Sequence, residues 1–409
     1  MNAVVDRSAR VVVTGLGVLT PVGETLEDFW DAAVHGVVGT RPLDRPDAAD
    51  FAGRLAGEVR GFVAPRGDGD RVTRLAVAAA VAATADAGLA LWAGDPARAG
   101  VCFGTLLGNR AALEPAVTRY HRGGGTNGTD AVAEGPRPVV GLADAVAREH
   151  GFLGPSSVVA TACASGNSAL AYAAEAIRAG RTDVMIAGGA DELSTGIMMM
   201  FASLRSLTDD ALRPFDRNRS GLVVSEGAAA LVLESYEHAR LRGARVYAEL
   251  AGWASACDAH HMTAPHPQGR GARRSLERAL AMSGVSLDRV GHVSAHGTGT
   301  PSNDSVEAAA VRAVFGERGP AVSSLKGALG HTQGAASAIE AVACVLALRD
   351  GVIPPTANLV DPDPDCAVDL VYGAARQAPL EVVVNNAFGF GGNTACTVFT
   401  RPGSGGNAG

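Results

Sequence analysis

The residue with the clearest chemical potential is Cys163, which lies between a strand-like run and a predicted helix. An apolar run at 157–160 leads into small residues around Cys163 and then into an Ala-rich stretch that continues to about residue 178. At a helix N-terminus the free N–H groups and the helix dipole favour a thiolate, so we expect a lowered thiol pKa and a nucleophile at neutral pH. The alternative for this residue alone is a small buried cysteine that fills core space.

Two histidines have similar settings further along the chain. His296 follows a short strand-like run in the sequence SAHGTGTP, and His331 follows a glycine-containing turn in the sequence SLKGALGH. Each could be a structural histidine by itself. Because sites in open α/β sheets assemble at the carboxyl ends of strands, three such residues framed by small neighbours predict one shared site.

A glycine-rich loop at 388–392 (FGFGG) separates two strand-like runs near the end of the chain. Its glycines permit unusual backbone angles, and a turn of this kind offers unpaired backbone N–H groups to a ligand. A tight hairpin without a ligand is the alternative for this segment alone.

The rest of the chain must supply the elements that hold these residues. It has 409 residues, of which 47% are hydrophobic and 19% charged, so it can bury a large core and is not a disordered chain. Strand-like and helix-like runs alternate, and the second half repeats the order of the first. We therefore predict an α/β fold of two similar halves, 1–250 and 251–409, with the nucleophilic cysteine in the first and both histidines in the second.

Four motifs in this order resemble the β-ketoacyl-acyl-carrier-protein synthases of the elongating Cys-His-His type. They are TACAS at 161–165, HGTGTP at 296–301, Lys326 with His331 five residues on, and the glycine-rich loop. The resemblance covers nearly the whole chain. It implies a thiolase-like fold, five layers in the order α-β-α-β-α with two pseudo-symmetric halves. It also implies a decarboxylative Claisen condensation of malonyl-carrier protein with an acyl chain held on Cys163.

The resemblance also implies a role for individual residues. The backbone N–H groups of Cys163 and Phe390 would form the oxyanion hole. His296 and His331 would donate hydrogen bonds to the malonyl thioester oxygen, and Lys326, paired with the acidic Glu307, would orient His331.

The remaining implied roles concern the substrate arm and the acyl chain. Thr298 and Thr300 would contact phosphopantetheine. Phe390 would gate an acyl pocket whose walls include Leu107, Phe201 and Met262. The phosphopantetheine arm arrives on the carrier protein, so we expect no separate cofactor.

Two departures from the family pattern lie close to the expected pocket. Ala164 stands where the family usually has Ser or Thr, and Asn393-Thr394 replaces the commoner Thr-Asn. The segment 203–213 also looks shorter than in the housekeeping members of the family. We therefore expect an enzyme of a type II polyketide or polyene-like pathway. A housekeeping fatty-acid elongating synthase and a non-catalytic, chain-length-factor-like partner subunit are the alternatives, and the presence of Cys163 counts against the second.

We expect the chain to work with an acyl carrier protein, as a homodimer or as a heterodimer with a chain-length-factor-like subunit. Carrier proteins are usually acidic and this chain has a net charge of −7, so docking needs a local basic patch. The candidates are four arginines, Arg66, Arg71, Arg74 and Arg205.

Several other signals are too weak to carry a function. Cys257, His260, His261 and His266 lack the spacing of a zinc finger, and Gly15-Leu16-Gly17 lacks the third glycine of a dinucleotide fingerprint. The acidic balance argues against nucleic-acid binding, and no stretch has the character of a membrane span. Six scattered cysteines without a C-x-x-C pair favour reduced thiols, so we expect a cytoplasmic protein without a metal.

Overall fold

The computed structural model describes residues 10–44, 50–51, 53–62, 70–89, 94–114 and 141–403. Within these ranges two half-sheets meet edge to edge. The N-terminal half-sheet is formed by β1 (Val11–Leu19), β4 (Ala99–Gly104), β5 (Ser156–Val159), β6 (Val184–Asp191) and β7 (Gly227–Ser235). The C-terminal half-sheet is formed by β8 (Ala248–Cys257), β9 (Val290–Ser294), β10 (Ala321–Ser323), β14 (Val382–Gly389) and β15 (Asn393–Thr400).

The strand order confirms that the two halves are alike. Across the described sheet the order is β12-β10-β9-β14-β15-β8-β1-β7-β6-β4-β5, where β12 (Asp369–Leu370) is a short outer strand. If the five main strands of each half are numbered along the chain, both halves read 3-2-4-5-1 from the outer edge to the centre. The halves join where β1 pairs with β8, at Val12 opposite Glu249 and Val13 opposite Ala248.

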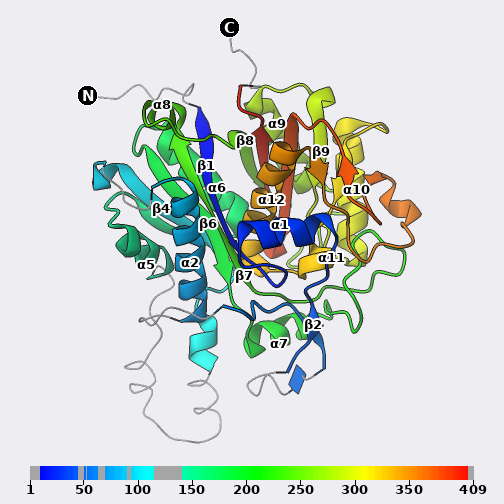
Figure 1. The fold of residues 1–409 in the computed structure, drawn as a ribbon. Helices are drawn as coiled ribbons and strands as arrows, with labels where there is room; N and C mark the ends of the chain where they lie inside the picture. The colour runs from blue at the N-terminus through cyan, green and yellow to red at the C-terminus, as the bar shows by residue number, and fades with distance from the viewer. Residues whose placement is uncertain are drawn as a thin grey trace, which may run out of the picture.

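Helices form the other three layers of the predicted α-β-α-β-α arrangement. The central layer contains α6 (Ser165–Arg178) and α12 (Ala336–Asp350), which contact each other and both half-sheets. Helices α2 (Arg71–Asp86) and α5 (Gly141–His150) cover one outer face, and α9 (Arg270–Ser283) and α10 (Pro301–Phe315) cover the other. In Figure 1, α2 and α5 lie at the left of the view, α10 at the right, and α12 between them.

Shorter elements complete the described fold. The helices are α1 (Leu26–Val34), α7 (Thr195–Ser203), α8 (Tyr236–Leu241) and α11 (Lys326–Leu329). The strands β2 (Arg41–Pro42) and β3 (Leu55–Ala56) pair with each other, as do β11 (Val352–Ile353) and β13 (Arg376–Gln377). No helix in these ranges is long and apolar enough to cross a membrane.

The composition of the central helices explains why they can lie between two sheets. Helix α12 is buried from Ala336 to Leu348, so it has no solvent-facing stripe. Small residues allow it to approach α6 closely, since a Cβ on Gly166 would lie 2.5 Å from the backbone nitrogen of Ala338. An outer helix shows the opposite pattern. Helix α2 starts at Asp70, whose side chain accepts a hydrogen bond from the Thr73 N–H, and buries one face through Leu75, Ala79 and neighbouring residues.

Candidate active site

Cys163 lies in a sharp turn between β5 and the first residue of α6, as the sequence predicts. Ala162, just before it, has a left-handed backbone with φ of 53°. Ser165 ties this turn down, because its hydroxyl accepts from the Thr161 N–H at 2.9 Å and donates to the Thr105 carbonyl at 3.0 Å. The turn therefore holds the Cys163 side chain at the bottom of a cavity, with only 4% of the residue exposed.

The ionisation of Cys163 differs from the sequence expectation. Burial raises the pKa of its thiol to about 12, although the nearby positive charge of Lys326 lowers it. Desolvation outweighs the helix N-terminus here because the sulfur is shielded from water. The resting group is a thiol, so it must give its proton to a base before it attacks. A side-chain nitrogen of His296 and one of His331 lie within 4.8 Å of the sulfur and of each other.

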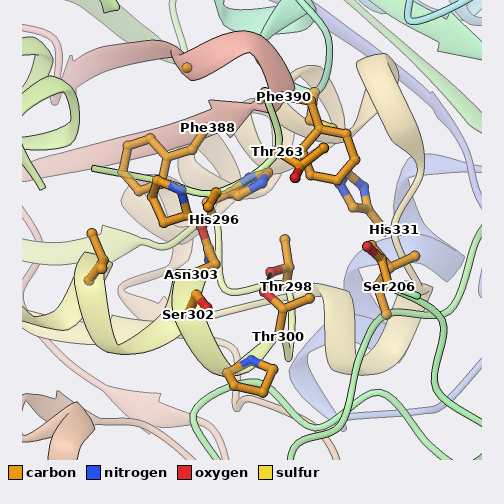
Figure 2. Close-up of a pocket in the computed structure, with 18 of the residues that line it drawn as sticks. Ser206, Thr263, His296, Thr298, Thr300, Ser302, Asn303, His331, Phe388 and Phe390 are labelled. Atoms are coloured by element: carbon orange, nitrogen blue, oxygen red, sulfur yellow. Dashed lines mark hydrogen bonds between the residues drawn. The ribbon is translucent and has the colours of Figure 1, made fainter. Parts of the chain in front are cut away.

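The two histidines come from different elements and face the same cavity (Figure 2). His296 follows β9, and the carboxylate of Glu307 on α10 accepts from the N–H groups of His296 and Gly297, both at 2.8 Å. His331 follows α11, and its N–H donates to the Val223 carbonyl at 2.7 Å. The imidazole rings are 5.5 Å apart and nearly perpendicular.

Both imidazoles are neutral in this setting. Burial and, next, the positive charge of Lys326 hold the pKa of His296 and that of His331 well below the usual 6.5. The Nδ1 atom of His331 accepts a hydrogen bond from the Gln333 N–H at 3.1 Å. A neutral imidazole carries one proton, so the proton of His331 is on Nε2 and can be donated into the cavity.

The predicted pairing of Lys326 with Glu307 is wrong. Lys326 Nζ donates to Glu340 Oε1 on α12 at 2.5 Å, and both side chains are almost fully buried. Glu307 is also buried, but its two oxygens hold the backbone around His296. Glu340 was not considered from the sequence, and the fold of α12 places its carboxylate on Lys326 while Glu307 bonds the His296 backbone.

The glycine-rich loop closes over Cys163. A Cβ on Gly389 would lie 3.0 Å from the Cys163 backbone nitrogen, so only glycine allows the loop to pass this close. The neighbouring Gly391 N–H donates to the Met262 carbonyl at 2.7 Å. The Phe388 ring packs edge-on against the His296 ring, with their centroids 5.6 Å apart, and the centroids of the Phe390 and Phe201 rings are 5.8 Å apart.

One cavity of about 290 Å³ brings together most of the residues that the sequence singled out. Its walls include Cys163, His296, His331, Thr298, Thr300, Phe201, Phe390 and Arg205. The sequence reasoning missed several polar residues of the wall, among them Ser206, Ser302 and Asn303 (Figure 2). Ser302 and Asn303 directly follow the HGTGTP motif, which was the one available signal for them.

The structure agrees with two of the three predicted wall residues of the acyl pocket and disagrees with the third. Leu107 and Phe201 pack in one apolar cluster with Phe390. Met262 is 74% exposed and does not line the cavity, although its backbone carbonyl accepts from the Gly391 N–H of the glycine-rich loop. The prediction for its side chain is therefore wrong. The chain leaves the sheet after β8, and residue 262 lies on the outside of the irregular segment that follows.

The four predicted docking arginines have different environments. Arg66 lies outside the described residues. The Arg71 guanidinium donates to the buried carboxylate of Glu226 at 3.0 and 2.6 Å, so it is committed to an internal ion pair. Arg74 is partly buried. Arg205 is exposed and lines the cavity, and it is the candidate best placed to meet an incoming partner.

Among the described residues, the one group of three or more metal-ligating side chains is Cys163, His296 and His331. The structure does not gather Cys257 with His260, His261 and His266 into such a group. The histidine proton assigned to Nε2 of His331 makes that atom a donor, which suits hydrogen bonding to a substrate oxygen better than ligation of a metal.

Comparison with known proteins places both halves in one family. Residues 8–239 match the family model "Beta-ketoacyl synthase, N-terminal domain", and residues 247–360 match "Beta-ketoacyl synthase, C-terminal domain". The chain is 39% identical to 3-oxoacyl-[acyl-carrier-protein] synthase 2 of Synechocystis, over 96% of this chain and 98% of that protein. It is also 39% identical to the tetracenomycin polyketide synthase ketoacyl synthase alpha subunit of Streptomyces glaucescens, over 96% of this chain and 97% of that one.

Solved structures give the same result. The ishigamide ketosynthase/chain length factor superposes with a TM-score of 0.89 at 37% identity, over 96% of this chain and 99% of that one. The ketosynthase structure described as AntDE:AntF, a type II polyketide acyl-carrier protein in complex with its ketosynthase, has a TM-score of 0.88 at 34% identity, over 96% and 99%.

Proposed function

Because the chain belongs to the β-ketoacyl synthase family, acyltransferases that form carbon–carbon bonds, we propose that it condenses malonyl-carrier protein with an acyl chain held on Cys163. The observation that carries this proposal is the meeting of the Cys163 thiol with two neutral imidazoles in one cavity, closed by the glycine-rich loop. A nucleophile and two hydrogen-bond donors are the groups that such a condensation requires.

In the first half-reaction Cys163 takes the acyl group. The thiol gives up its proton, which ends on the departing carrier thiol, and the sulfur attacks the thioester carbonyl of the acyl donor. The oxyanion that develops would face the backbone N–H groups of Cys163 and Phe390. The close approach of Gly389 to the Cys163 nitrogen supports this arrangement. The carrier thiol leaves with a proton, and the acyl group stays on the sulfur.

In the second half-reaction the malonyl group loses carbon dioxide. His296 and His331 donate N–H groups to its thioester oxygen, which stabilises the enolate as the carboxylate leaves. The enolate carbon attacks the acyl carbonyl on Cys163, and the Cys163 sulfur is expelled and takes up a proton. Thr298 and Thr300, which line the cavity, would contact the phosphopantetheine arm, and the reaction would use no other cofactor.

We assign the enzyme to a type II polyketide or polyene-like pathway. This is supported by the relatives from Streptomyces polyketide systems and by the departures at Ala164 and Asn393, of which Asn393 lines the cavity. The equal identity to 3-oxoacyl-[acyl-carrier-protein] synthase 2 favours the alternative, elongation of ordinary fatty acids. Equal loading of all ordinary saturated acyl chains onto Cys163 would favour the alternative, a fatty-acid elongating synthase, over the polyketide assignment.

The partners follow from the same proposal. An acyl carrier protein would dock near Arg205 at the cavity. The chain would form a homodimer, or a heterodimer with a chain-length-factor-like subunit, the pairing named in the ishigamide ketosynthase/chain length factor. The site of action would be the cytoplasm, where the free cysteines stay reduced.

The test is intact-protein mass spectrometry after incubation with a panel of acyl-carrier proteins. The wild type should gain one acyl mass and Cys163→Ala none. Cys257→Ala is the matched control, because Cys257 is exposed and could be acylated without catalysis. The proposal fails if Cys163→Ala is still acylated, or if the acylated wild type releases no carbon dioxide from malonyl-carrier protein with or without a co-expressed partner subunit.

A further inference from the structure

Gln333 has an unusual backbone immediately beside the cavity. Its φ is 58°, in the left-handed region that costs free energy for any residue with a Cβ, and the residue is 1% exposed. It begins the single turn that leads from His331 into α12. A buried polar residue in this conformation must be held by its surroundings. Here hydrogen bonds from the side-chain amide and one from the backbone N–H of Gln333 hold it.

The side chain of Gln333 joins two separate segments. Its Nε2 atom donates to the Glu192 carbonyl at 3.1 Å and to the Ser225 carbonyl at 3.0 Å, so both amide hydrogens are used. Ser225 is itself bonded to the catalytic segment, because its N–H donates to the His331 carbonyl at 2.9 Å. These two side-chain bonds, here called the clamp, therefore fix the turn after His331 relative to the segment 223–225, which also bonds the His331 backbone.

The backbone of Gln333 has a different target. Its N–H donates to His331 Nδ1 at 3.1 Å. That contact decides which nitrogen of a neutral imidazole carries the proton, because an Nδ1 that accepts cannot also be protonated. The N–H and the side-chain amide belong to the same residue, so the bonds that hold the Gln333 side chain also hold this N–H opposite the ring two residues earlier.

We propose that Gln333 is a positioning residue whose side-chain clamp holds the left-handed turn that keeps His331 in its Nε2–H form. This inference rests on the proposed function, in which His331 Nε2–H donates to the malonyl thioester oxygen. Without the clamp the turn relaxes, the Gln333 N–H moves off Nδ1, and part of the protein carries the proton on Nδ1. Such molecules offer a lone pair where the enolate needs a donor, so decarboxylation slows while acylation of Cys163 continues.

Asn358 provides a matched control. It also has a positive φ, 64°, and its side-chain Nδ2 donates to two backbone carbonyls, Leu212 at 3.1 Å and Gly327 at 2.9 Å. Neither of these hydrogen bonds involves His296 or His331. Gln333→Gly and Asn358→Gly both remove two amide–carbonyl bonds at a position where glycine tolerates the backbone. Gln333→Met, which keeps the buried volume but donates nothing, serves if the glycine variant does not fold.

The experiment compares these variants in two readouts. The ¹⁵N spectrum of histidine-labelled protein, with the His331 signals assigned by their loss in His331→Asn, should show one Nε2–H form in the wild type and in Asn358→Gly. Gln333→Gly or Gln333→Met should show a mixture of both forms. The variant kcat for condensation should fall by up to about a hundredfold, with a much smaller change in the rate of Cys163 acylation.

Two results would overturn the inference. One is a Gln333 variant whose His331 keeps a single Nε2–H form. The other is an equal loss of kcat in Asn358→Gly and Gln333→Gly. A wild type that condenses no malonyl donor would contradict the proposed function instead, and the ¹⁵N spectra would still decide the role of Gln333.

Discussion

Burial keeps the reacting side chains neutral, and the buried Lys326 ammonium further shifts their pKa values. Cys163, His296 and His331 are each shielded from water, which keeps the thiol and both imidazoles neutral. The positive charge of Lys326 lowers the pKa of all three groups. It favours the thiolate that attacks and keeps the imidazoles in the uncharged form that presents an N–H.

The first prediction concerns the stability contributed by the Lys326–Glu340 ion pair. Glu340→Gln removes the carboxylate and leaves a buried ammonium without its partner, so we expect the free energy of unfolding to fall by about 3–5 kcal/mol. Condensation should slow with it. Urea unfolding measures the first effect. The double variant Lys326→Met with Glu340→Leu should recover stability while staying inactive, and a loss below about 1 kcal/mol in Glu340→Gln would contradict the assigned pairing.

The second prediction concerns how folding stability depends on pH through the carboxyl group of Glu192. Burial, followed by the negative charges of Asp70 and Glu226, raises its pKa to about 8, and its Oε1 has no hydrogen-bond partner among the described residues. A carboxyl whose folded pKa exceeds its unfolded value favours folding below the unfolded value, near 4.3, and loses that contribution as pH rises towards 8. The slope is about 1.4 kcal/mol per pH unit.

The neutral variant Glu192→Gln removes this titration. Its melting temperature should therefore fall less than that of the wild type between pH 6 and pH 8, measured by scanning calorimetry in buffers of one ionic strength. Parallel curves for the two proteins would show that Glu192 is already ionised at pH 6. The comparison is clean because the Glu192 carbonyl, which accepts from Gln333, is unchanged.

At the scale of elements, the site forms where strands end and short turns reverse the chain. Ala162 before the nucleophile and Gln333 after His331 both have left-handed backbones without being glycine. Such conformations persist only where the surroundings determine them. Here Ser165 accepts a hydrogen bond from the Thr161 N–H, and Gln333 donates one to the Glu192 carbonyl. The strain therefore lies in the turns that aim the reacting side chains.

The glycine-rich loop makes a prediction at this scale. In Gly389→Ala the new Cβ would lie 2.9 Å from the Ala162 Cβ and 3.0 Å from the Cys163 nitrogen, so the loop must move away. We expect kcat to fall by up to about a hundredfold with little change in melting temperature, because the oxyanion donors separate. Gly403→Ala, near the end of the described chain, is the control for backbone strain without a clash, because φ there is 83° and the new Cβ would meet nothing within 4 Å. Unchanged acylation and condensation in Gly389→Ala would argue against an oxyanion hole at Phe390.

At the scale of the whole molecule, the two halves share one interior. A buried amide pair crosses between them: Asn167 Nδ2 donates to the Asn385 carbonyl at 3.0 Å, and Asn385 Nδ2 donates to Asn167 Oδ1 at 2.9 Å. Ser337 on α12 joins the same network, since its carbonyl accepts from Asn385 at 2.8 Å. The half that carries Cys163 and the half that carries both histidines are therefore held in register directly behind the nucleophile.

This network predicts cooperative unfolding. Asn167→Ala should lower the free energy of unfolding by about 1–3 kcal/mol for each buried group left without a partner. In urea the loss of helix by circular dichroism should still coincide with the change in tryptophan fluorescence, to which Trp30 in one half and Trp253 in the other contribute. Two separate transitions in the wild type would mean that the halves are independent folding units.

The sequence by itself determined the reactive residues, the alternation of strands and helices, and the likeness of the two halves. Cys163, His296, His331 and the glycine-rich loop lie in short motifs whose small neighbours and strand ends are local features. Local patterns are readable because each follows from a few adjacent residues and their backbone preferences.

Only the tertiary structure decided which distant groups meet and how far water is excluded. It paired Lys326 with Glu340 instead of Glu307, turned Met262 outwards, and raised the pKa of Cys163 where the helix N-terminus alone predicted a lowered one. It also joined Gln333 to Glu192 and Ser225, which are 141 and 108 residues away. Ion-pair choice and desolvation depend on the packing of whole layers, and no local pattern in the sequence carries that information.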